Sequence, residues 1–364
     1  MSATTTRATR YQELFDRYHG QITGGELAPG DRLPSFPELR AQGYGQATVE
    51  KALQMLEGEG LIQRTNGRGV FVAKAERRTN RTGLVGVMGL GDMGTIHPYW
   101  LELLTGAHNA LHQNGFEAVL MKQSEVSRWD RLEGVLGFGF GCVEQARLRP
   151  AGMPIAGAML DGGDFPYARI NEAQGVEEAV AHLVSLGHRR IAYLVADAGP
   201  RDLRIAGYLA GLGKAGIKVQ ESWVKNLQPV ASPSMNRFAS AGYLTMEHWL
   251  RDDWRAMGCT ALLAWNDDAA SGAIRAFREA GLAVPEDVSV VGFDGSPAAW
   301  TCDPPLTTLE IPLRQMGRAS AEWLLSLMKG EMLAVGPRTY NPTLHRGSST
   351  TWIKPGLREG EQLS

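Results

Sequence analysis

The sequence is poor in the features that mark secreted and disulfide-bonded proteins. Among its 364 residues there are only three cysteines, which lie far apart at Cys142, Cys259 and Cys302. Three distant cysteines cannot build a disulfide framework, and none of them has the CxxC spacing of a zinc site. This cysteine usage is typical of a protein that is kept in a reducing compartment.

Long apolar runs and a secretion leader are missing as well. No stretch approaches about 18 uninterrupted apolar residues, the length that a membrane-spanning helix needs. The first residues, MSATTTRATRYQELFDR, are polar rather than basic and then apolar. We therefore expect a cytoplasmic protein with no membrane partner.

The whole chain carries no strong net charge, but its two parts differ in the sign of their charge. The 37 basic and 39 acidic residues give a formal charge of −2. Residues 1–80 hold 11 Lys and Arg against 9 Asp and Glu, which leaves 26 against 30 for the rest. With 43% apolar residues the composition is that of two or three folded domains rather than a disordered chain. The opposite charges of the two parts indicate modules with different partners.

The first 73 residues have the pattern of three helices followed by a hairpin. Large apolar side chains recur at helical spacing at Tyr11, Leu14, Phe15, Tyr18 and Ile22. They predict a helix that ends near residue 24, and a short helix is expected after Ser35 as its N-cap. A third helix is expected over residues 46–58, and LIQRTNGRGVFVA predicts two strands joined at Asn66-Gly67. These elements predict a winged helix-turn-helix.

The motifs of this module resemble the DNA-binding domain of the GntR superfamily over about 65 residues. The shared positions are Gly25, Leu27, PGDRLPS at 29–35, Leu39, Thr48-Val49, Ala52-Leu53, Leu56, EGLI at 59–62 and RGVFV at 68–72. By this resemblance the helix at 46–58 enters the major groove of DNA, and the hairpin follows the backbone and the minor groove. The DNA contacts that it implies are Arg32, Ser35, Gln46, Thr48, Lys51, Arg64, Arg68 and Gly69.

Two positions depart from the family pattern. Family members usually carry Arg where this chain has Gln46 and Glu50, and the turn GYG is one residue shorter than usual. Glutamine favours adenine through its amide, and glutamate accepts a hydrogen bond from cytosine. We therefore expect an operator that differs from the family's common one. Taken singly, Arg32, Lys51 and Arg68 would be ordinary surface charges, and only their joint place on this frame favours DNA contact.

The remaining sequence predicts a linker and a large α/β module. Residues 74–82, KAERRTNRT, carry four basic residues and one acid, as in an exposed tether. From residue 83 short apolar runs alternate with amphipathic stretches, which predicts two lobes of parallel sheet with helices on both faces. The expected helices cover residues 98–113, 173–186, 203–215, 236–251, 267–280 and 312–328. The fold class is therefore α/β, with an N-terminal winged helix-turn-helix.

One motif would favour an enzyme. GLGDMG at 89–94 has the GxGxxG form of a nicotinamide-dinucleotide fingerprint directly after a predicted strand. That fingerprint needs a helix that starts within the glycines, but here the helix is expected to begin at Pro98. The acid that would bind the ribose is replaced by Lys122. An NAD(P)-dependent dehydrogenase is therefore kept only as an alternative.

Other enzymatic chemistry finds little support in the sequence. His108 and His112 share a helix face, but no HExxH glutamate or third metal ligand accompanies them. A GxSxG nucleophile elbow and a Walker lysine are missing too. We expect no catalytic residue, no metal and no cofactor.

The segments of the large module resemble the sensor domain of the LacI/GalR family, which is itself similar to periplasmic sugar-binding proteins. They are Ile170-Asn171, Gly175, Leu183, HRRIA at 188–192, LRIAGY at 203–208, AWNDDAA at 264–270, DVSVVGFD at 287–294, PPLTTL at 304–309, Gly317 and RGSST at 346–350. The resemblance covers about residues 83–350, although the stretch 122–134 is shorter than usual. It implies a DNA-binding domain at 1–73, a linker at 74–82 and a two-lobed periplasmic-binding-protein-like domain at 83–364.

By the same resemblance, the ends of the strands hold a small-molecule effector. The implied contacts are Tyr99, Trp100, Asp161, Arg204, Trp265, Asn266, Phe293 and Asp294. Trp300 is expected near the mouth of the cleft, and Arg237 or Phe238 is expected to face the ligand ring. Carboxylates, amides, arginine and aromatic rings are the groups that recognise sugar hydroxyls and ring faces.

Each of these candidates has a structural alternative. Asn266 could only cap the following helix, Asp294 could only satisfy a turn, and Arg204 could be part of a structural ion pair. The tryptophans are more often core residues than ligand platforms. These polar groups are all expected at the carboxyl ends of strands, and their common location favours a ligand-binding role over the structural alternatives.

Together the two resemblances predict a ligand-responsive transcriptional regulator, a repressor of carbohydrate-utilisation genes. We expect a homodimer that binds double-stranded operator DNA and responds to a sugar or sugar derivative. The alternative is a sugar-binding transport protein of the same sensor architecture, against which the fused DNA module and the missing leader count.

Overall fold

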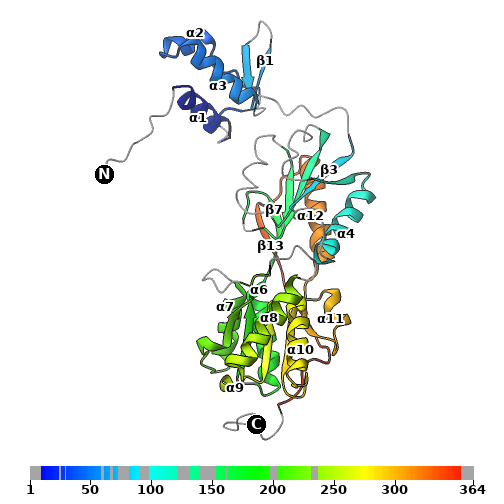
Figure 1. Ribbon diagram of the computed structural model, residues 1–364. Coiled ribbons are helices and arrows are strands. Elements are labelled where there is room, and N and C mark those ends of the chain that lie inside the picture. The colour runs from blue at the N-terminus through cyan, green and yellow to red at the C-terminus, as the bar shows by residue number, and fades with distance from the viewer. Residues whose placement is uncertain are drawn as a thin grey trace, which may run out of the picture.

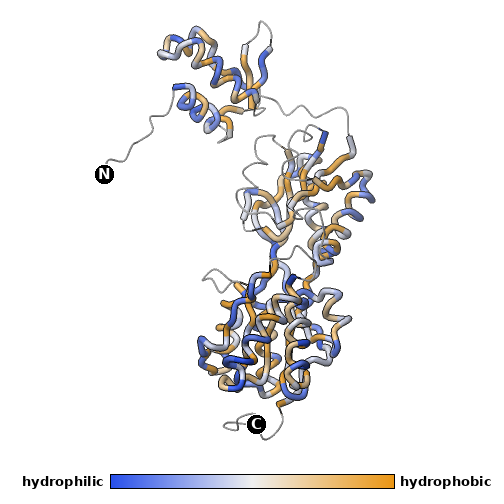
Figure 2. Tube along the Cα trace, viewed as in Figure 1, coloured by the Kyte–Doolittle hydropathy of each residue, from blue (hydrophilic) through white to orange (hydrophobic). Residues whose placement is uncertain are grey.

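The computed structural model describes residues 10–23, 26–28, 30–58, 61–65, 69–72, 82–89, 98–121, 131–139, 153–160, 162–196, 203–230 and 237–353. These residues form an N-terminal head and two lobes, each lobe built around a six-stranded sheet (Figure 1). Apolar residues concentrate on the strands of the two lobes, and polar residues gather along the outside (Figure 2). In these ranges no helix is long and apolar enough to cross a membrane.

The head is the winged helix-turn-helix that the sequence predicts. Its elements are α1 (Arg10–Thr23), α2 (Phe36–Ala41), α3 (Gln46–Gly58), β1 (Ile62–Thr65) and β2 (Gly69–Val72). The apolar side of α1 buries Leu14, Phe15 and Tyr18 in one cluster with the inner side of α3. Ile62 and Val72 pair across the antiparallel hairpin and enter the same cluster. The hairpin and the helices therefore share one small core.

The first lobe has an all-parallel sheet in the order β13-β7-β6-β5-β3-β4. Its elements are β3 (Leu84–Met88), α4 (Pro98–Gln113), β4 (Glu117–Leu120), β5 (Gly134–Phe138), β6 (Ile155–Ala158), β7 (Pro166–Ile170), α12 (Leu313–Met328) and β13 (Gly336–Tyr340). Helices α4 and α12 approach very closely. A Cβ at Gly106 would collide with the backbone of Arg314, and one at Gly317 with the backbone of Leu103. Glycine at both positions is what allows this contact.

The second lobe has the sheet order β14-β12-β11-β10-β8-β9, parallel except for the edge strand β14. Its strands are β8 (Ile191–Val195), β9 (Val224–Asn226), β10 (Ala261–Ala264), β11 (Ser289–Asp294), β12 (Thr307–Glu310) and β14 (Thr343–His345). Its helices are α6 (Glu172–Ser185), α7 (Leu203–Lys214), the 3₁₀ turn η3 (Glu221–Trp223), α8 (Arg237–Asp252), α9 (Trp254–Met257), α10 (Asp267–Glu279) and α11 (Pro297–Thr301). Strands β8, β10 and β11 are buried along their whole length, as expected where helices cover both faces.

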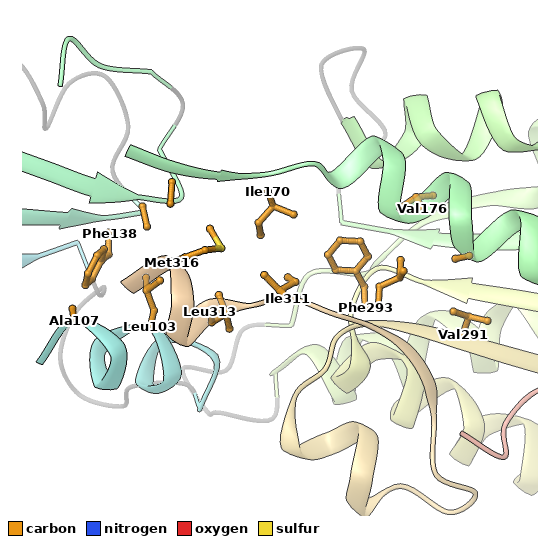
Figure 3. Packing of buried hydrophobic residues seen from close by; sticks show 14 of the residues in the cluster. Leu103, Ala107, Phe138, Ile170, Val176, Val291, Phe293, Ile311, Leu313 and Met316 are labelled. Carbon is orange, nitrogen blue, oxygen red and sulfur yellow. The ribbon is translucent and has the colours of Figure 1, made fainter. Parts of the chain in front are cut away.

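The chain passes between the two lobes three times. It does so from β7 into α6, from β12 into α12 and from β13 into β14. Ile170 and Ile311 are buried at two of these crossings, in one apolar cluster with Leu313 and Phe293 (Figure 3). The apolar core therefore continues from one lobe into the other along the crossing segments.

The long helices agree with the prediction to within a residue or two at each end. Helix α4 begins at Pro98 and ends at Gln113, and α10 begins at Asp267, as expected. The expected parallel sheets with an N-terminal helix-turn-helix are confirmed. The strands β7, β9, β12, β13 and β14 were not predicted, and the shortened stretch lies largely outside the described residues, at 122–130.

Candidate DNA interface and effector site

The third helix of the head divides cleanly into a buried side and an exposed side. Val49, Leu53 and Leu56 are buried, whereas the exposed positions carry Gln46, Ala47, Glu50, Lys51, Gln54 and Glu57. Thr48 lies between the two sides and is half-buried. A helix held by its apolar side and polar along the other is the form in which a recognition helix meets the major groove.

The hairpin is extended by the segment that leads to α2. Arg32 pairs with Phe71 across an isolated bridge, and Leu33 donates its backbone N–H to Val70 O at 2.9 Å. The Arg32 guanidinium lies over Gly69, where an added Cβ would be 3.1 Å from Nε and where φ is +115°. Only glycine suits this backbone and this approach. Arg68, a predicted contact, lies outside the described residues.

Helix α2 is held by a capping pair at its start. Both the backbone N–H and the hydroxyl of Ser35 donate to Oε2 of Glu38, at 2.5 and 2.6 Å. These hydrogen bonds lower the pKa of the exposed Glu38 carboxyl. Ser35, which the resemblance assigns to DNA, therefore also fixes the first turn of α2.

Two predicted contact residues are already engaged within the head. The Lys51 ammonium lies 4.4 Å from the centre of the Tyr11 ring. Arg64 on β1 forms ion pairs with two glutamates of α3, to Glu50 at 2.8 Å and to Glu57 at 3.0 Å. Glu57 was not predicted, although its place seven residues after Glu50 puts both on one helix face. Arg64 therefore joins the wing to the exposed side of α3.

In the second lobe, the candidate effector residues meet at the carboxyl ends of neighbouring strands. Trp265 and Asn266 follow β10, and Asp294 ends β11 directly after Phe293. Arg204 reaches the same place from the first turn of α7. Its guanidinium lies between two rings, 4.0 Å from the centre of Phe293 and 4.8 Å from that of Trp265. The structure thus brings the predicted side chains of Trp265, Phe293 and Asp294 together around the Arg204 cation.

The Arg204 guanidinium is also anchored by hydrogen bonds. It donates from Nε and Nη2 to Oε1 of Glu172, at 3.0 and 2.9 Å, and from Nη1 to the carbonyl of Trp265 at 2.5 Å. Burial works to lower the pKa of Arg204, but Glu172 and Asp294 outweigh it, so the pKa is raised. Glu172 was not predicted, although its place at the first position of α6, directly after Asn171, was a usable signal. The ion-pair alternative for Arg204 is therefore realised in the structure.

Asn266 has the structural role that was named as its alternative. Its Oδ1 accepts a hydrogen bond from the backbone N–H of Ala269 at 2.9 Å, which caps α10. The side chain is only 3% exposed. The cap holds Asn266 beside Trp265, at the strand end where a ligand would be bound.

Two buried acids lie at this strand end. Asp294 has a φ of +116°, a left-handed conformation that costs a non-glycine residue about 1–3 kcal/mol. Burial raises the pKa of Asp294 well above its usual range, although Arg204 opposes the shift. Asp267 accepts from the Thr308 hydroxyl at 2.5 Å and from the Ser296 N–H at 2.7 Å. Burial nevertheless raises its pKa to about 7.

The first lobe contributes aromatic residues from the start of α4. The Tyr99 hydroxyl donates to Sδ of Met159 at 3.7 Å, and the Tyr99 ring packs edge-on against Trp100. Burial raises the pKa of Tyr99, and the charges of Asp294 and Arg204 also act on it, so Tyr99 lies close to the second-lobe cluster. Asp161, the other first-lobe candidate, lies outside the described residues.

The remaining aromatic candidates separate into two groups. Phe238 packs on Trp265 with ring centres 5.1 Å apart, and Arg237 lies over Phe238. Of the two residues considered for that position, Phe238 therefore joins the aromatic row. Trp300 is 44% exposed and meets His345 edge-on at 4.5 Å.

The motifs that favoured other chemistry add no site in the described part of the chain. Of GLGDMG only Gly89 is described. The rings of His108 and His112 are stacked 5.8 Å apart on α4. Within the described ranges, no group of three or more His, Cys, Asp or Glu side chains is placed to hold a metal ion.

A winged helix-turn-helix joined to a two-lobed α/β unit defines a DNA-binding protein that carries a small-molecule-binding domain. Residues 10–72 match the gntR family of bacterial regulatory proteins, and residues 180–350 match a periplasmic binding protein-like domain. The arabinose metabolism transcriptional repressor of Geobacillus stearothermophilus is 26% identical over 94% of this chain and 98% of its own length. The transcriptional regulator GalS of Salmonella typhimurium is 32% identical over 55% of this chain and 56% of its own.

A solved structure supports the same fold. The complex of the transcriptional regulator CelR with cellobiose has a TM-score of 0.64 at 24% identity, and the match covers 84% of this chain and 91% of that one. The chain is therefore a transcriptional regulator that joins a GntR-type helix-turn-helix to a periplasmic binding protein-like domain, and its relatives are regulators of the LacI/GalR family.

Proposed function

We propose that the protein is a repressor whose hold on operator DNA is changed by a sugar or sugar derivative bound between its two lobes. The DNA-binding domain would be residues 1–73, the linker 74–82 and the sensor 83–364. The observation that carries the proposal is the Arg204 cation, held between the Trp265 and Phe293 rings beside Asp294. We assign it no catalytic step and place it in the cytoplasm, where its DNA target lies.

The chemistry of the cluster suits a polyhydroxylated ligand. Aromatic faces accept the C–H surface of a sugar ring, and carboxylates and amides bind pairs of neighbouring hydroxyls. Asp294 and the Nδ2 amide of Asn266, whose Oδ1 is taken up by the helix cap, would bind hydroxyls from the second lobe. Tyr99 and Trp100 would close on the ring from the first lobe, and Asp161 stays a predicted contact. A relative named for arabinose metabolism and a structural neighbour bound to cellobiose support this ligand class.

The three crossings between the lobes supply a route from ligand to DNA. A ligand that contacts both lobes favours the closed arrangement, and a rotation about the crossing segments would move the first lobes. In a homodimer on a two-fold operator, this movement changes the separation of the two winged heads. A typical coupling of about 1–3 kcal/mol corresponds to a 5- to 150-fold change in operator affinity.

A thermal-shift screen of sugars, sugar acids and purines on the full-length protein tests the ligand class. A compound that binds the folded state raises the melting temperature in a concentration-dependent way. We expect hits among the sugars, lost in Arg204→Ala. The matched control is Arg237→Ala, which removes an exposed guanidinium that also lies over a ring, Phe238, in the same lobe. No shift with any sugar, or an equal loss in both variants, would contradict the proposal.

A further inference from the structure

The exposed side of α3 carries an acid where DNA is expected to bind. Glu50 lies in the middle of the stripe formed by Gln46, Glu50 and Gln54, which follow one another at one helical turn. Its side chain is 49% exposed. A carboxylate facing a phosphate-lined groove is repelled unless a cation neutralises it. The structure supplies that cation from the wing.

Arg64 fixes the Glu50 carboxylate through one of its two oxygens. Nη1 of Arg64 donates to Oε1 of Glu50 at 2.8 Å, and Nε2 of Gln54 reaches the same oxygen at 3.5 Å. Within the described part of the chain, no donor reaches Oε2. Nε of Arg64 binds Glu57 at 3.0 Å, so the guanidinium is held at two points. The arrangement orients Glu50 and leaves Oε2 as an acceptor on the exposed side of the helix.

An ionised carboxylate accepts hydrogen bonds but cannot donate them. In the major groove, guanine and thymine present acceptors, whereas cytosine and adenine present amino groups. Adenine also presents the N7 acceptor beside its amino group, which would face a carboxylate unfavourably. Cytosine itself presents no acceptor beside its N4 amino group in the major groove. A glutamate carboxylate held in place is therefore expected to bind the amino group of cytosine best.

We propose, on the basis of the DNA-binding function above, that Glu50 is a specificity-determining residue that reads a cytosine in each operator half-site. Arg64 is the positioning residue that pairs with Glu50 and orients its carboxylate. This assignment changes the role expected for Arg64 from a DNA contact to a support of the contact.

The test is selection of double-stranded DNA from a randomised library by the full-length protein and its variants, followed by affinity measurements on the selected sequences. The wild type is expected to select a two-fold motif with cytosine at one position of each half-site. In E50R the same position should change to guanine, which arginine binds bidentately, with a change in preference on the order of tenfold. In E50Q the cytosine preference should be lost, and in R64Q it should weaken while the rest of the motif is kept.

Glu57→Gln is the matched control. It removes an acid of the same charge from the same arginine, but one that lies two turns further along α3. It should leave the selected base unchanged. All four side-chain changes are at exposed positions, and the melting temperature of each variant verifies that it folds.

The outcomes separate the inference from the function on which it rests. A wild type that selects no motif contradicts both. If E50Q and E50R select the same motif as the wild type, the specificity role of Glu50 is wrong, whereas the DNA-binding function stands. If R64Q weakens binding to all sequences equally and lowers the salt dependence by about one phosphate contact, Arg64 binds the backbone and the positioning role is wrong.

Discussion

The head and the second lobe each contain an arginine–glutamate pair, and the two pairs differ in their surroundings. The Arg64 and Glu50 side chains are 33% and 49% exposed. The Arg204 and Glu172 side chains are 7% and 27% exposed, and Arg204 also lies between two aromatic rings. The N···O distances are nearly equal, at 2.8 and 2.9 Å. The two pairs therefore have nearly the same ion-pair distance and differ in how deeply their side chains are buried.

The difference in burial gives each pair a different task. An exposed ion pair contributes about 0–1 kcal/mol to stability, so evolution is free to use it for recognition of a large, hydrated partner such as DNA. A buried charge must stay paired, because an unpaired one costs several kcal/mol. Under the proposed function, the pair in the lobe would support the effector site, and the pair in the head would present a surface to DNA.

The largest effect is expected from removal of the buried cation. Arg204→Ala leaves Glu172 and the Trp265 carbonyl without their donor and should lower the free energy of unfolding by about 3–5 kcal/mol. Urea denaturation followed by tryptophan fluorescence measures it. Arg204→Lys, which keeps the charge, should recover part of the loss. A loss of less than about 1 kcal/mol in the free energy of unfolding would show that the buried pair contributes no more than an exposed pair, which would contradict the comparison.

The next effect is the pH dependence of the free energy of unfolding, which arises from Asp267 in the second lobe. An unfolded aspartate ionises near pH 4, whereas burial raises the pKa of folded Asp267 to about 7. Between these values the folded state binds more protons, so its free energy of unfolding should fall as pH rises, by up to about 1.4 kcal/mol per unit. Asp267→Asn should remove the part of this slope that Asp267 contributes, while the part from Asp294, whose pKa is also raised, should remain. Urea melts of both proteins between pH 4.5 and 7.5 measure it, and identical slopes would show that Asp267 is ionised throughout.

A smaller effect is expected from the wing. Gly69→Ala places a side chain at φ +115° and against the Arg32 guanidinium, which should cost about 1–3 kcal/mol of head stability. If the wing contacts the DNA backbone as proposed, the same change should weaken binding to every DNA sequence. Calorimetry and a gel-shift titration measure the two effects. Gly45→Ala, where an added Cβ meets nothing within 4 Å, is the control.

The smallest stability effect should come from the exposed pair. Arg64→Ala is expected to change the free energy of unfolding by less than about 1 kcal/mol. Urea denaturation beside the Arg204→Ala variant compares the two pairs directly. A loss as large as that of Arg204→Ala would mean that Arg64 is a structural residue, and its role in base selection would need another explanation.

The regular elements could be predicted because long amphipathic helices repeat their apolar positions over several turns. The apolar spacing in α1 and the start of α4 at Pro98 are examples. The strands β13 and β14 could not, because GPRTY and TLH are short edge strands in which no residue is fully buried. Their place depends on the third crossing between the lobes, which local sequence does not encode.

The residues of the candidate sites could be predicted, together with their positions on strands and helices. The contacts between those residues could not. That Arg204 would pair with Glu172 depends on how α7 packs against α6. That Arg64 would bind Glu50 and Glu57 depends on the angle of the wing to α3. Asn266 was expected either to bind the effector or to cap a helix, and the structure shows the cap. The proposed ligand and DNA contacts stay predictions.

The central claim is that a sugar in the sensor changes how the head holds DNA. Its most direct test is the affinity of the full-length protein for its selected duplex DNA, measured with and without a saturating amount of the sugar that gives the largest thermal shift. We predict a 5- to 150-fold change in affinity, absent in Arg204→Ala and kept in Arg237→Ala. An affinity that is the same with and without the bound sugar would contradict the account.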